Sequence, residues 1–399
     1  MCGDAGGSLV SALHHWTTSR DLSFVGVPVG DAGTGLEGHA LGTCVGGGAF
    51  VFDPFDAYRA GLVTNPNVVV AGVIGVGKST FVKMLVRRAL HQGRRAVIVD
   101  PKGEYRELAH AMGGVVVTVA PHRESWCSPF SGDPNNDVTL LSTLLGSLRQ
   151  RALGDDELYV LTSAWSRDAA TAPRPLFALF EELRDALSDD APSPRQSLAF
   201  GLRRLVEGDL AGVFDGSGEP VDVDAPLVVL DVSTLWSHPA FPAIAVGAAA
   251  VARRLVDDPS RPGYLVLDEA WALLAAESVA RWLQGSLKLA RARGVAHVLV
   301  LHRWSDVMAA AHGGPTHRAL NATLLRDCET LVLLRHLPGD LDALDAVVAL
   351  HPREARAVVE LPRGAALVRY GEGRSLVIFE PDAHDAEVID TNAAMLVSS

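Results

Sequence analysis

The stretch NVVVAGVIGVGKSTFVKML, residues 67–85, decides the fold of this chain. Its opening run of valines predicts a buried strand, and apolar residues at helical spacing from Ser79 onward predict a helix. Between them, Gly72 to Ser79 fits the pattern G-x-x-x-x-G-K-[ST], in the strand–loop–helix context that a phosphate-binding loop (P-loop) requires. Glycines adopt positive φ without strain, which lets backbone N–H groups wrap around phosphates. We therefore predict an α/β nucleotide-binding fold; a glycine-rich turn without a function is the alternative.

The residues of this loop have separate predicted roles. Lys78 is expected to reach the β- and γ-phosphates, and the Ser79 hydroxyl is expected to ligate Mg²⁺. Thr80 lies one residue further and is expected to contact the α-phosphate. The predicted nucleotide-binding set is Gly72, Gly75, Val76, Gly77, Lys78, Ser79 and Thr80.

A second segment supplies the acids that a P-loop needs. GYLVLDEAWALL, residues 263–274, is predicted to be a buried strand followed by Asp268 and Glu269. We expect Asp268 to hold Mg²⁺ through water and Glu269 to polarise the attacking water as general base. Paired acids favour hydrolysis over binding alone. The alternative is a helix N-cap acid with an acidic neighbour.

Composition indicates a globular protein and limits its partners. Of the 399 residues, 48% are hydrophobic and 21% are charged, and the formal net charge is −12. This charge gives no support for binding nucleic acid or an anionic membrane surface, although a basic pore is compatible with it. The cysteines lack metal-ligand spacing and are expected to be reduced thiols: Cys2, Cys44, Cys127 and Cys328. We find no signal peptide and no unbroken run of about 18 apolar residues, which predicts a cytoplasmic protein.

The rest of the chain alternates predicted strands and helices, which favours a mostly parallel sheet with helices on both faces. Further strands are expected at 94–100, 114–120, 226–232, 263–268, 296–302 and 329–335. We expect a tail and glycine-rich β lead-in at 1–66, an ATPase core at 67–136 and 211–399, and an α-helical insertion at 137–210. A C-terminal β-hairpin is expected within residues 365–380, with its turn at Gly371 and Gly373.

Two further polar residues follow predicted strands. Asp100 lies within VDPKGEY, residues 99–105, where Pro101 and Gly103 also fit a simple turn. His302 ends the strand at 296–302 and is either a sensor of the γ-phosphate or a structural histidine.

Three arginines are candidates for action between subunits. Arg291 and Arg293 precede the strand at 296–302, and Arg326 precedes the strand at 329–335. An arginine at a subunit boundary can neutralise charge that develops on a neighbour's γ-phosphate. The alternative is that these are solvated arginines on amphipathic helices.

Taken together, NPNVVVAGVIGVGKST (65–80), VDPKGEY and VLDEAWALL (266–274) resemble the cytoplasmic ATPases of conjugation and type IV secretion, the VirB/TraC-like motors of the HerA–FtsK superfamily. The resemblance covers roughly residues 25–395 and includes the terminal DTNAAM. It implies a RecA-like core that binds ATP and Mg²⁺ and assembles as a homo-oligomeric ring, a hexamer. It matches Arg291 to the trans-acting arginine. The family usually has glutamine where His302 stands; we expect imidazole to donate one hydrogen bond where an amide donates and accepts, so coupling to hydrolysis is expected to change.

The favoured function is an ATPase (ATP and water to ADP and phosphate) that powers substrate transfer or channel and pilus assembly. The resemblance implies a cytoplasmic protein at the inner face of the cell membrane, with inner-membrane secretion-channel proteins and DNA or a nucleoprotein substrate as partners. One alternative is a DNA-pumping translocase or coupling protein of the same superfamily. Another is a nucleotide-binding regulatory subunit that hydrolyses weakly. A small-molecule phosphotransferase fits poorly, because the sequence shows no lid-like arginine cluster.

Overall fold

One central β-sheet organises the protein. The structure is a computed structural model, and it describes residues 34–121, 128–166, 176–189, 191–214, 224–258, 260–309 and 314–389. In these ranges the sheet has 11 strands in the order β2-β1-β11-β10-β9-β3-β8-β7-β4-β6-β5. The strands are β1 (Ala40–Cys44), β2 (Ala49–Val51), β3 (Val68–Ala71), β4 (Arg95–Asp100), β5 (Val115–Thr118), β6 (Leu227–Asp231), β7 (Gly263–Leu267), β8 (Val295–Leu301), β9 (Thr330–Leu333), β10 (Ala365–Tyr370) and β11 (Gly373–Phe379).

The sheet has a parallel part and an antiparallel part. Strands β9, β3, β8, β7, β4, β6 and β5 pair with parallel neighbours. Strands β9, β10, β11, β1 and β2 pair antiparallel and extend the sheet at one end. The central parallel strands β3, β7 and β8 are buried along their whole length, as their mainly apolar sequences predict. The predicted mostly parallel sheet is confirmed.

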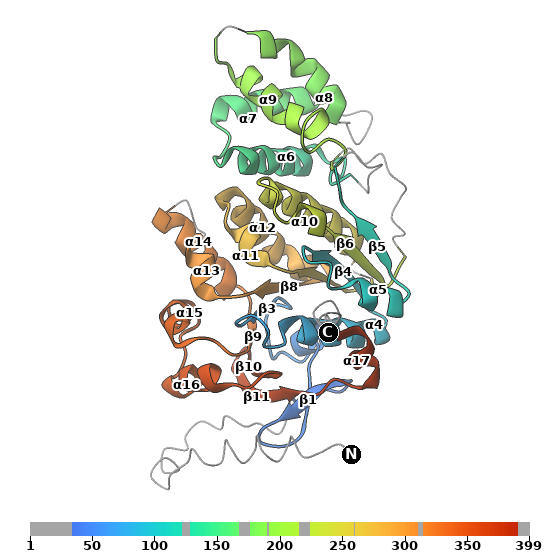
Figure 1. Cartoon of the computed structure of the whole chain (residues 1–399), viewed down its shortest axis with the longest axis vertical. Coiled ribbons are helices and arrows are strands. Elements are labelled where there is room, and N and C mark those ends of the chain that lie inside the picture. Colours follow the sequence, from blue (N-terminus) through green and yellow to red (C-terminus); the bar gives the residue numbers. More distant parts are fainter. Residues whose placement is uncertain are drawn as a thin grey trace, which may run out of the picture.

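Helices cover both faces of this sheet (Figure 1). The helices are α3 (Pro54–Arg59), α4 (Lys78–His91), α5 (Arg106–Ala111), α6 (Pro134–Arg149), α7 (Asp155–Trp165), α8 (Leu176–Leu183), α9 (Pro194–Val206), α10 (Phe241–Val256), α11 (Ala270–Leu274), α12 (Glu277–Arg293), α13 (Trp304–Ala309), α14 (Gly314–Arg326), α15 (Leu341–Val348), α16 (Pro352–Glu360) and α17 (Ala383–Ile389), with short 3₁₀ turns η2 (Arg184–Ser188), η3 (Ser233–Leu235) and η4 (Pro338–Asp340).

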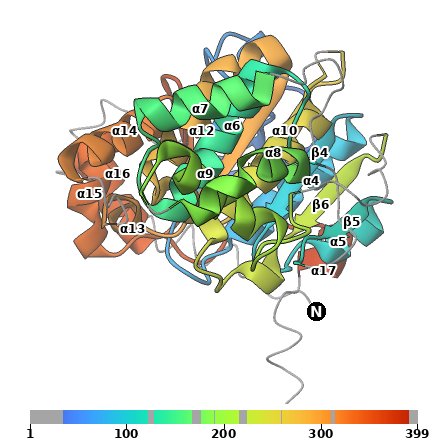
Figure 2. The ribbon, with the colours of Figure 1, turned by 90° about the horizontal axis from the view of Figure 1, so that it is seen from above.

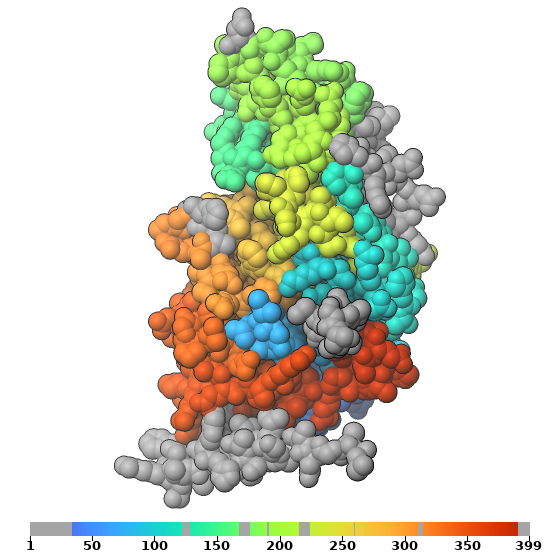
Figure 3. All heavy atoms as spheres, viewed as in Figure 1, coloured from blue at the N-terminus to red at the C-terminus, as the bar shows by residue number. Residues whose placement is uncertain are grey.

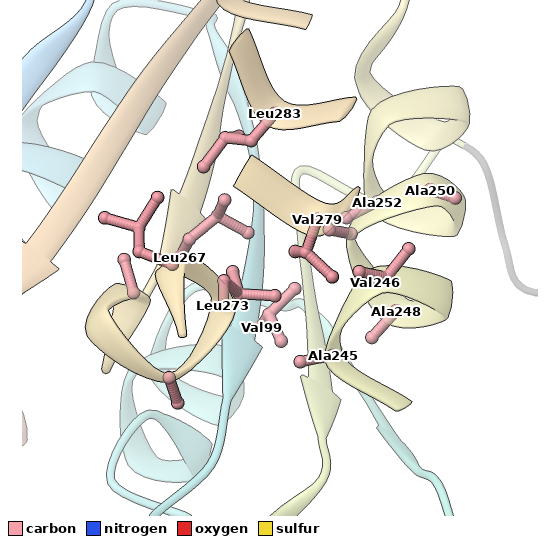
Figure 4. Packing of buried hydrophobic residues seen from close by; sticks show 14 of the residues in the cluster. Val99, Ala245, Val246, Ala248, Ala250, Ala252, Leu267, Leu273, Val279 and Leu283 are labelled. Atoms are coloured by element: carbon pink, nitrogen blue, oxygen red, sulfur yellow. The ribbon is translucent and has the colours of Figure 1, made fainter. Parts of the chain in front are cut away.

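The side chains of β3 show why two helical layers form. Val69 and Ala71 join the apolar cluster that includes residues of α10, α11 and α12. Val68 and Val70 point to the other face and join the cluster that includes α4 and α5. Figure 4 shows the first of these clusters, in which Val99 of β4 gathers with residues of the three helices. Alternating apolar side chains therefore bury both faces of the sheet.

The helices of residues 134–206 form an outer tier. Helix α6 packs on α10 and α12, and α7 and α9 pack on α6. This tier is the green upper end of the molecule in Figure 1 and in the space-filling view of Figure 3, and it lies nearest the viewer in Figure 2. The α-helical insertion predicted from the sequence is confirmed as part of the fold.

The described part of the N-terminal lead-in contains one helix that the sequence analysis did not predict. Residues 40–51 form β1 and β2, as expected, but Pro54–Arg59 forms α3. The Asp53 side chain caps it by accepting hydrogen bonds from the Phe55 and Asp56 backbone N–H groups at 2.9 and 3.0 Å. An N-cap aspartate followed by proline at the first helical position is a recognised start signal. Residues 1–33 and the segment DTNAAM, residues 390–395, lie outside the described ranges.

The C-terminal hairpin is confirmed, but its predicted turn is partly wrong. Tyr370 pairs with Gly373, so the two turn residues are Gly371 and Glu372. Gly371 has φ 54°. Positive φ at the first central residue only is the feature of a type II′ turn. Gly373 is the first residue of β11 and does not supply the turn.

Candidate nucleotide site

Four neighbouring parallel strands end at one edge of the sheet. In the order β3, β8, β7 and β4, they are followed by the P-loop, by His302, by the pair Asp268 and Glu269, and by the VDPKGEY turn. Segments far apart in the sequence are therefore side by side at the carboxyl ends of the strands. Open α/β sheets bind their ligands outside this edge.

The P-loop has the backbone shape that a phosphate cradle needs. Gly77 has φ 107° and caps α4, which begins at Lys78. At Gly72, a Cβ atom would lie 2.9 Å from the Leu334 Cβ, so a side chain has no room there. The first N–H groups of α4, which include those of Ser79 and Thr80, have no partner within the helix and face the loop. The site thus offers backbone donors and the positive end of a helix to phosphate oxygens.

The Lys78 ammonium lies inside this loop. Its Nζ donates to the carbonyl oxygens of Gly72 and Val73 at 2.8 and 2.9 Å. A third partner is His302 Nδ1, at 3.1 Å. Burial lowers the pKa of Lys78 to about 8, against the opposing effect of the nearby Glu269 carboxylate. Lys78 is held by weak carbonyl acceptors that phosphate oxygens can replace.

Asp268 fits the expected metal-holding acid. It follows β7 and is 6% exposed. Its Oδ1 accepts the Glu269 backbone N–H at 2.9 Å, whereas Oδ2 is buried without a hydrogen-bond partner among the described residues. Burial, reinforced by the Glu269 charge, raises the pKa of Asp268 to about 7. A buried carboxylate oxygen without a donor suits a cation or its water ligands. With Ser79 on α4, it would hold Mg²⁺, which would neutralise charge on the phosphates.

Glu269 has an unusual backbone and fully engaged side-chain oxygens. Its φ of 52° and ψ of 38° are left-handed, a conformation that costs a non-glycine residue about 1–2 kcal/mol. Its Oε1 accepts from His302 Nε2 at 2.5 Å and pairs with the Lys102 ammonium. Its Oε2 accepts from Trp271 Nε1 at 2.5 Å. Backbone strain of this kind gathers at functional sites.

These contacts keep Glu269 ionised. Burial alone would raise its pKa, but the hydrogen bonds from His302 and Lys102 and the positive charge of Lys102 outweigh burial and lower the pKa to about 2. A carboxylate with so low a pKa is a poor proton acceptor. Glu269, predicted to be the general base, lies at the same sheet edge as the P-loop, and its contacts lower its basicity.

His302 connects the two halves of the site. Its Nδ1 accepts from Lys78 while its Nε2 faces Glu269, which places the ring proton on Nε2. The expectation that imidazole would only donate here was wrong. A ring with one protonated nitrogen donates and accepts at once, as the amide of glutamine does.

Asp100 shapes the VDPKGEY turn. Its Oδ1 accepts the backbone N–H groups of Lys102 and Gly103 at 3.1 and 2.8 Å, and its Oδ2 accepts that of Tyr105 at 2.9 Å. Gly103 has φ 73°. The segment therefore forms the turn that the sequence analysis gave as an alternative for Asp100. This turn places Lys102 beside Glu269.

The three candidate arginines lie away from these residues. Arg291, near the end of α12, precedes the amino end of β8, and its side chain donates to the Thr64 carbonyl at 3.4 Å. Arg293 pairs with Asp257 at 2.9 Å. Arg326 donates to the carbonyls of Val347 and Ala346 at 3.2 and 2.6 Å. Within one copy, none of these contacts joins them to the P-loop edge.

Sequence reasoning missed two members of the site, Lys102 and Trp271. Lys102 stands inside VDPKGEY, but only the strand order β7-β4 shows that it faces Glu269. Trp271 packs edge-on against Trp236 at 5.9 Å between ring centroids, and its indole N–H also donates to Glu269. In the sequence, the signal for this contact was that Trp271 follows Glu269 by two residues.

Comparisons with known proteins agree with this fold. The family model described as the TraG P-loop domain matches residues 40–139. No curated protein matches the chain. The solved structure of VirB4 of Thermoanaerobacter pseudethanolicus aligns with a TM-score of 0.76 at 24% sequence identity, covering 88% of this chain and 98% of that one. The plasmid coupling protein TrwB in complex with ADP and Mg²⁺ aligns with a TM-score of 0.58 at 19% identity, covering 86% and 89%.

No helix in the described ranges is both long and apolar enough to cross a membrane. The resemblance read from the P-loop, VDPKGEY and the acid pair is confirmed at the level of the fold. This chain has the RecA-like P-loop fold that VirB4 and TrwB share.

Proposed function

We propose that this protein is the ATP-hydrolysing motor of a conjugative or type IV secretion system. Its fold is that of VirB4 and of a conjugative coupling protein solved with nucleotide, which supports this class of motor. It would couple hydrolysis to substrate transfer or to channel and pilus assembly. ATP is the substrate, and Mg²⁺ held by Ser79 and Asp268 is the cofactor.

The observation that carries the ATPase assignment is the line of polar residues along the sheet edge. Lys78 on α4, His302 after β8 and Glu269 after β7 are linked by contacts of 3.1 and 2.5 Å. A γ-phosphate bound by Lys78 would lie next to the acid. Water would attack the γ-phosphorus, the bond to the β,γ-bridging oxygen would break, and the water proton would pass to Glu269 as ADP leaves.

The position of Arg291 supports action between copies. Arg291 contacts Thr64, which lines a cleft of about 500 Å³ at the amino ends of β3 and β9, opposite the P-loop edge. An arginine there can meet γ-phosphate only of a neighbouring copy. We propose a closed ring of identical subunits, a hexamer, with each site formed between two copies.

Two other functions remain as alternatives. TrwB is described as a coupling protein, but it aligns less well than VirB4, and the net charge of −12 gives no general attraction to DNA. A weakly hydrolysing regulatory subunit is favoured by one observation: both carboxylate oxygens of Glu269 are engaged. The motor reading also places the protein in the cytoplasm, against inner-membrane channel proteins, with DNA or a nucleoprotein as its cargo.

One experiment separates these readings. ATPase rate is measured against protein concentration, with and without single- or double-stranded DNA. The motor predicts a rate per subunit that rises with concentration as sites assemble and changes little with DNA. Strong stimulation by DNA would favour the translocase. A rate that stays at background at every concentration would favour the regulatory subunit and refute the motor.

A further inference from the structure

The ion pair between Lys102 and Glu269 raises a question that the proposed chemistry does not answer. Lys102 pairs with Oε1, the same oxygen that His302 contacts, while Trp271 holds Oε2. A water molecule that must give its proton to Glu269 needs one of these oxygens. The side chain of Lys102 is more exposed than that of His302: 34% against 15%.

The backbone of Lys102 is held by its turn, and its side chain is long enough to reach more than one partner. Asp100 holds the turn through three backbone N–H groups, so the Lys102 Cα stays at the carboxyl edge of β4. Beyond Cα, the lysine side chain is a flexible stem of four carbons that ends in an ammonium group with three hydrogen-bond donors. In the described residues its ammonium has one carboxylate partner, Glu269, and a contact with His302 Nε2 at 3.4 Å.

Lysine is a rare residue in this chain. Of the 35 lysines and arginines, four are lysines: Lys78, Lys83, Lys102 and Lys288. Lys78 is in the P-loop and Lys102 pairs with Glu269, so two of the four lysines lie at the same site. The electrostatic effect of Lys102 reaches Lys78 itself, whose pKa it helps to lower. A γ-phosphate between these two ammonium groups would relieve their repulsion.

We propose that Lys102 is a second ligand of the γ-phosphate, and that the phosphate and Glu269 compete for it. This proposal rests on the proposed ATPase function. When ATP binds, Lys102 transfers from Oε1 of Glu269 to a γ-phosphate oxygen, which exposes Oε1 to the attacking water. ADP has no γ-phosphate, so with ADP the ion pair persists. The ion pair thereby keeps the acid engaged until a triphosphate is present.

The test compares affinity for ADP and for an imido-bridged, non-hydrolysable ATP analogue, both with Mg²⁺, by isothermal titration calorimetry. Wild type is expected to prefer the analogue. Lys102→Gln is expected to lower that preference about tenfold, because a charge-assisted hydrogen bond is lost, and to leave ADP affinity near wild type. Lys102→Arg should keep part of the preference. Lys288→Gln removes the same charge from the exposed surface of α12 and should change neither affinity.

A double-mutant cycle checks the competition itself. Glu269→Gln weakens the ion pair, so it should raise analogue affinity when residue 102 is lysine and not when it is glutamine. An unchanged preference in Lys102→Gln overturns the proposal, as does an equal effect of Glu269→Gln in both backgrounds. ADP binding shows whether each variant is folded. Wild type that binds both nucleotides but never hydrolyses ATP refutes the motor alone, since the preference is measured without turnover.

Discussion

Replacing Asp100 by alanine tests how the VDPKGEY turn is held. The carboxylate accepts three backbone N–H groups at 2.8 to 3.1 Å. At about 1 kcal/mol net for each hydrogen bond, the three contribute roughly 3 kcal/mol. Burial of the carboxylate, which raises its pKa, opposes part of this gain. We therefore expect Asp100→Ala to lower the free energy of opening this turn by about 2 kcal/mol.

Amide hydrogen exchange measures this local opening directly. A change of about 2 kcal/mol corresponds to roughly thirtyfold faster exchange at Lys102, Gly103 and Tyr105. Asp100→Asn is expected to have a smaller effect, since its oxygen can still accept the first two N–H groups while its amide nitrogen faces that of Tyr105. Asp231→Asn is the control.

Asp231 makes that control informative because it pairs with Asp100 in the sheet register. Its Oδ1 accepts the Ser233 backbone N–H at 2.9 Å and its Oδ2 pairs with Arg106. In Asp231→Asn the side-chain oxygen can still accept from Ser233 while the negative charge that pairs with Arg106 is lost, and exchange at the three amides of the VDPKGEY turn should stay at the wild-type rate. Unchanged exchange at those three amides in Asp100→Ala would show that the carboxylate does not hold the turn, and the placement of Lys102 would need another cause.

Glu269→Gln keeps the side-chain shape but removes the proton acceptor, so kcat for ATP is expected to fall about 100-fold or more with ADP affinity nearly unchanged; equal turnover contradicts the general base. Arg291→Ala should also lower kcat, and mixing it with Glu269→Gln should restore part of the rate if the arginine acts in trans. Arg293→Ala, which breaks the pair with Asp257, should not complement in this way. Asp268 has a pKa raised from 3.8 to about 7 by burial, so the folded state binds its proton more tightly and stability falls as pH rises through that window. Asp268→Asn should therefore be more stable than wild type in thermal unfolding at pH 8 without nucleotide, and a difference that persists at pH 4 would contradict this cause.

The sequence predicts those parts of the site whose residues are contiguous in the chain. Two such segments are Gly72 to Ser79 and Asp268–Glu269. Each of them follows an apolar run of the length typical of a buried strand. The strand–helix alternation predicted the parallel sheet for the same reason. Helix α3 was missed although Asp53 and Pro54 mark its start, because the surrounding glycines favoured turns.

The other parts depend on which strands are neighbours. Lys102 reaches Glu269 because β4 lies next to β7, an order that local patterns do not encode. Trp271 lies on α11, which begins directly after the left-handed backbone of Glu269, a conformation that no composition rule predicts for a glutamate. Arg291 lies at the opposite edge of the sheet in its own chain, so its proposed role in trans can be tested only with a second copy present.

The pairing of β1 with β11 has a consequence for synthesis of the protein. Gly42, near the start of the described chain, is in register with Phe379, near its end. The ribosome releases β11 long after β1, so β1 and β2 have no sheet edge to join until β11 has emerged. Contacts of such long sequence separation form slowly. Until then the nascent chain would expose the apolar side chains of β1, and we expect it to depend on chaperones for that interval.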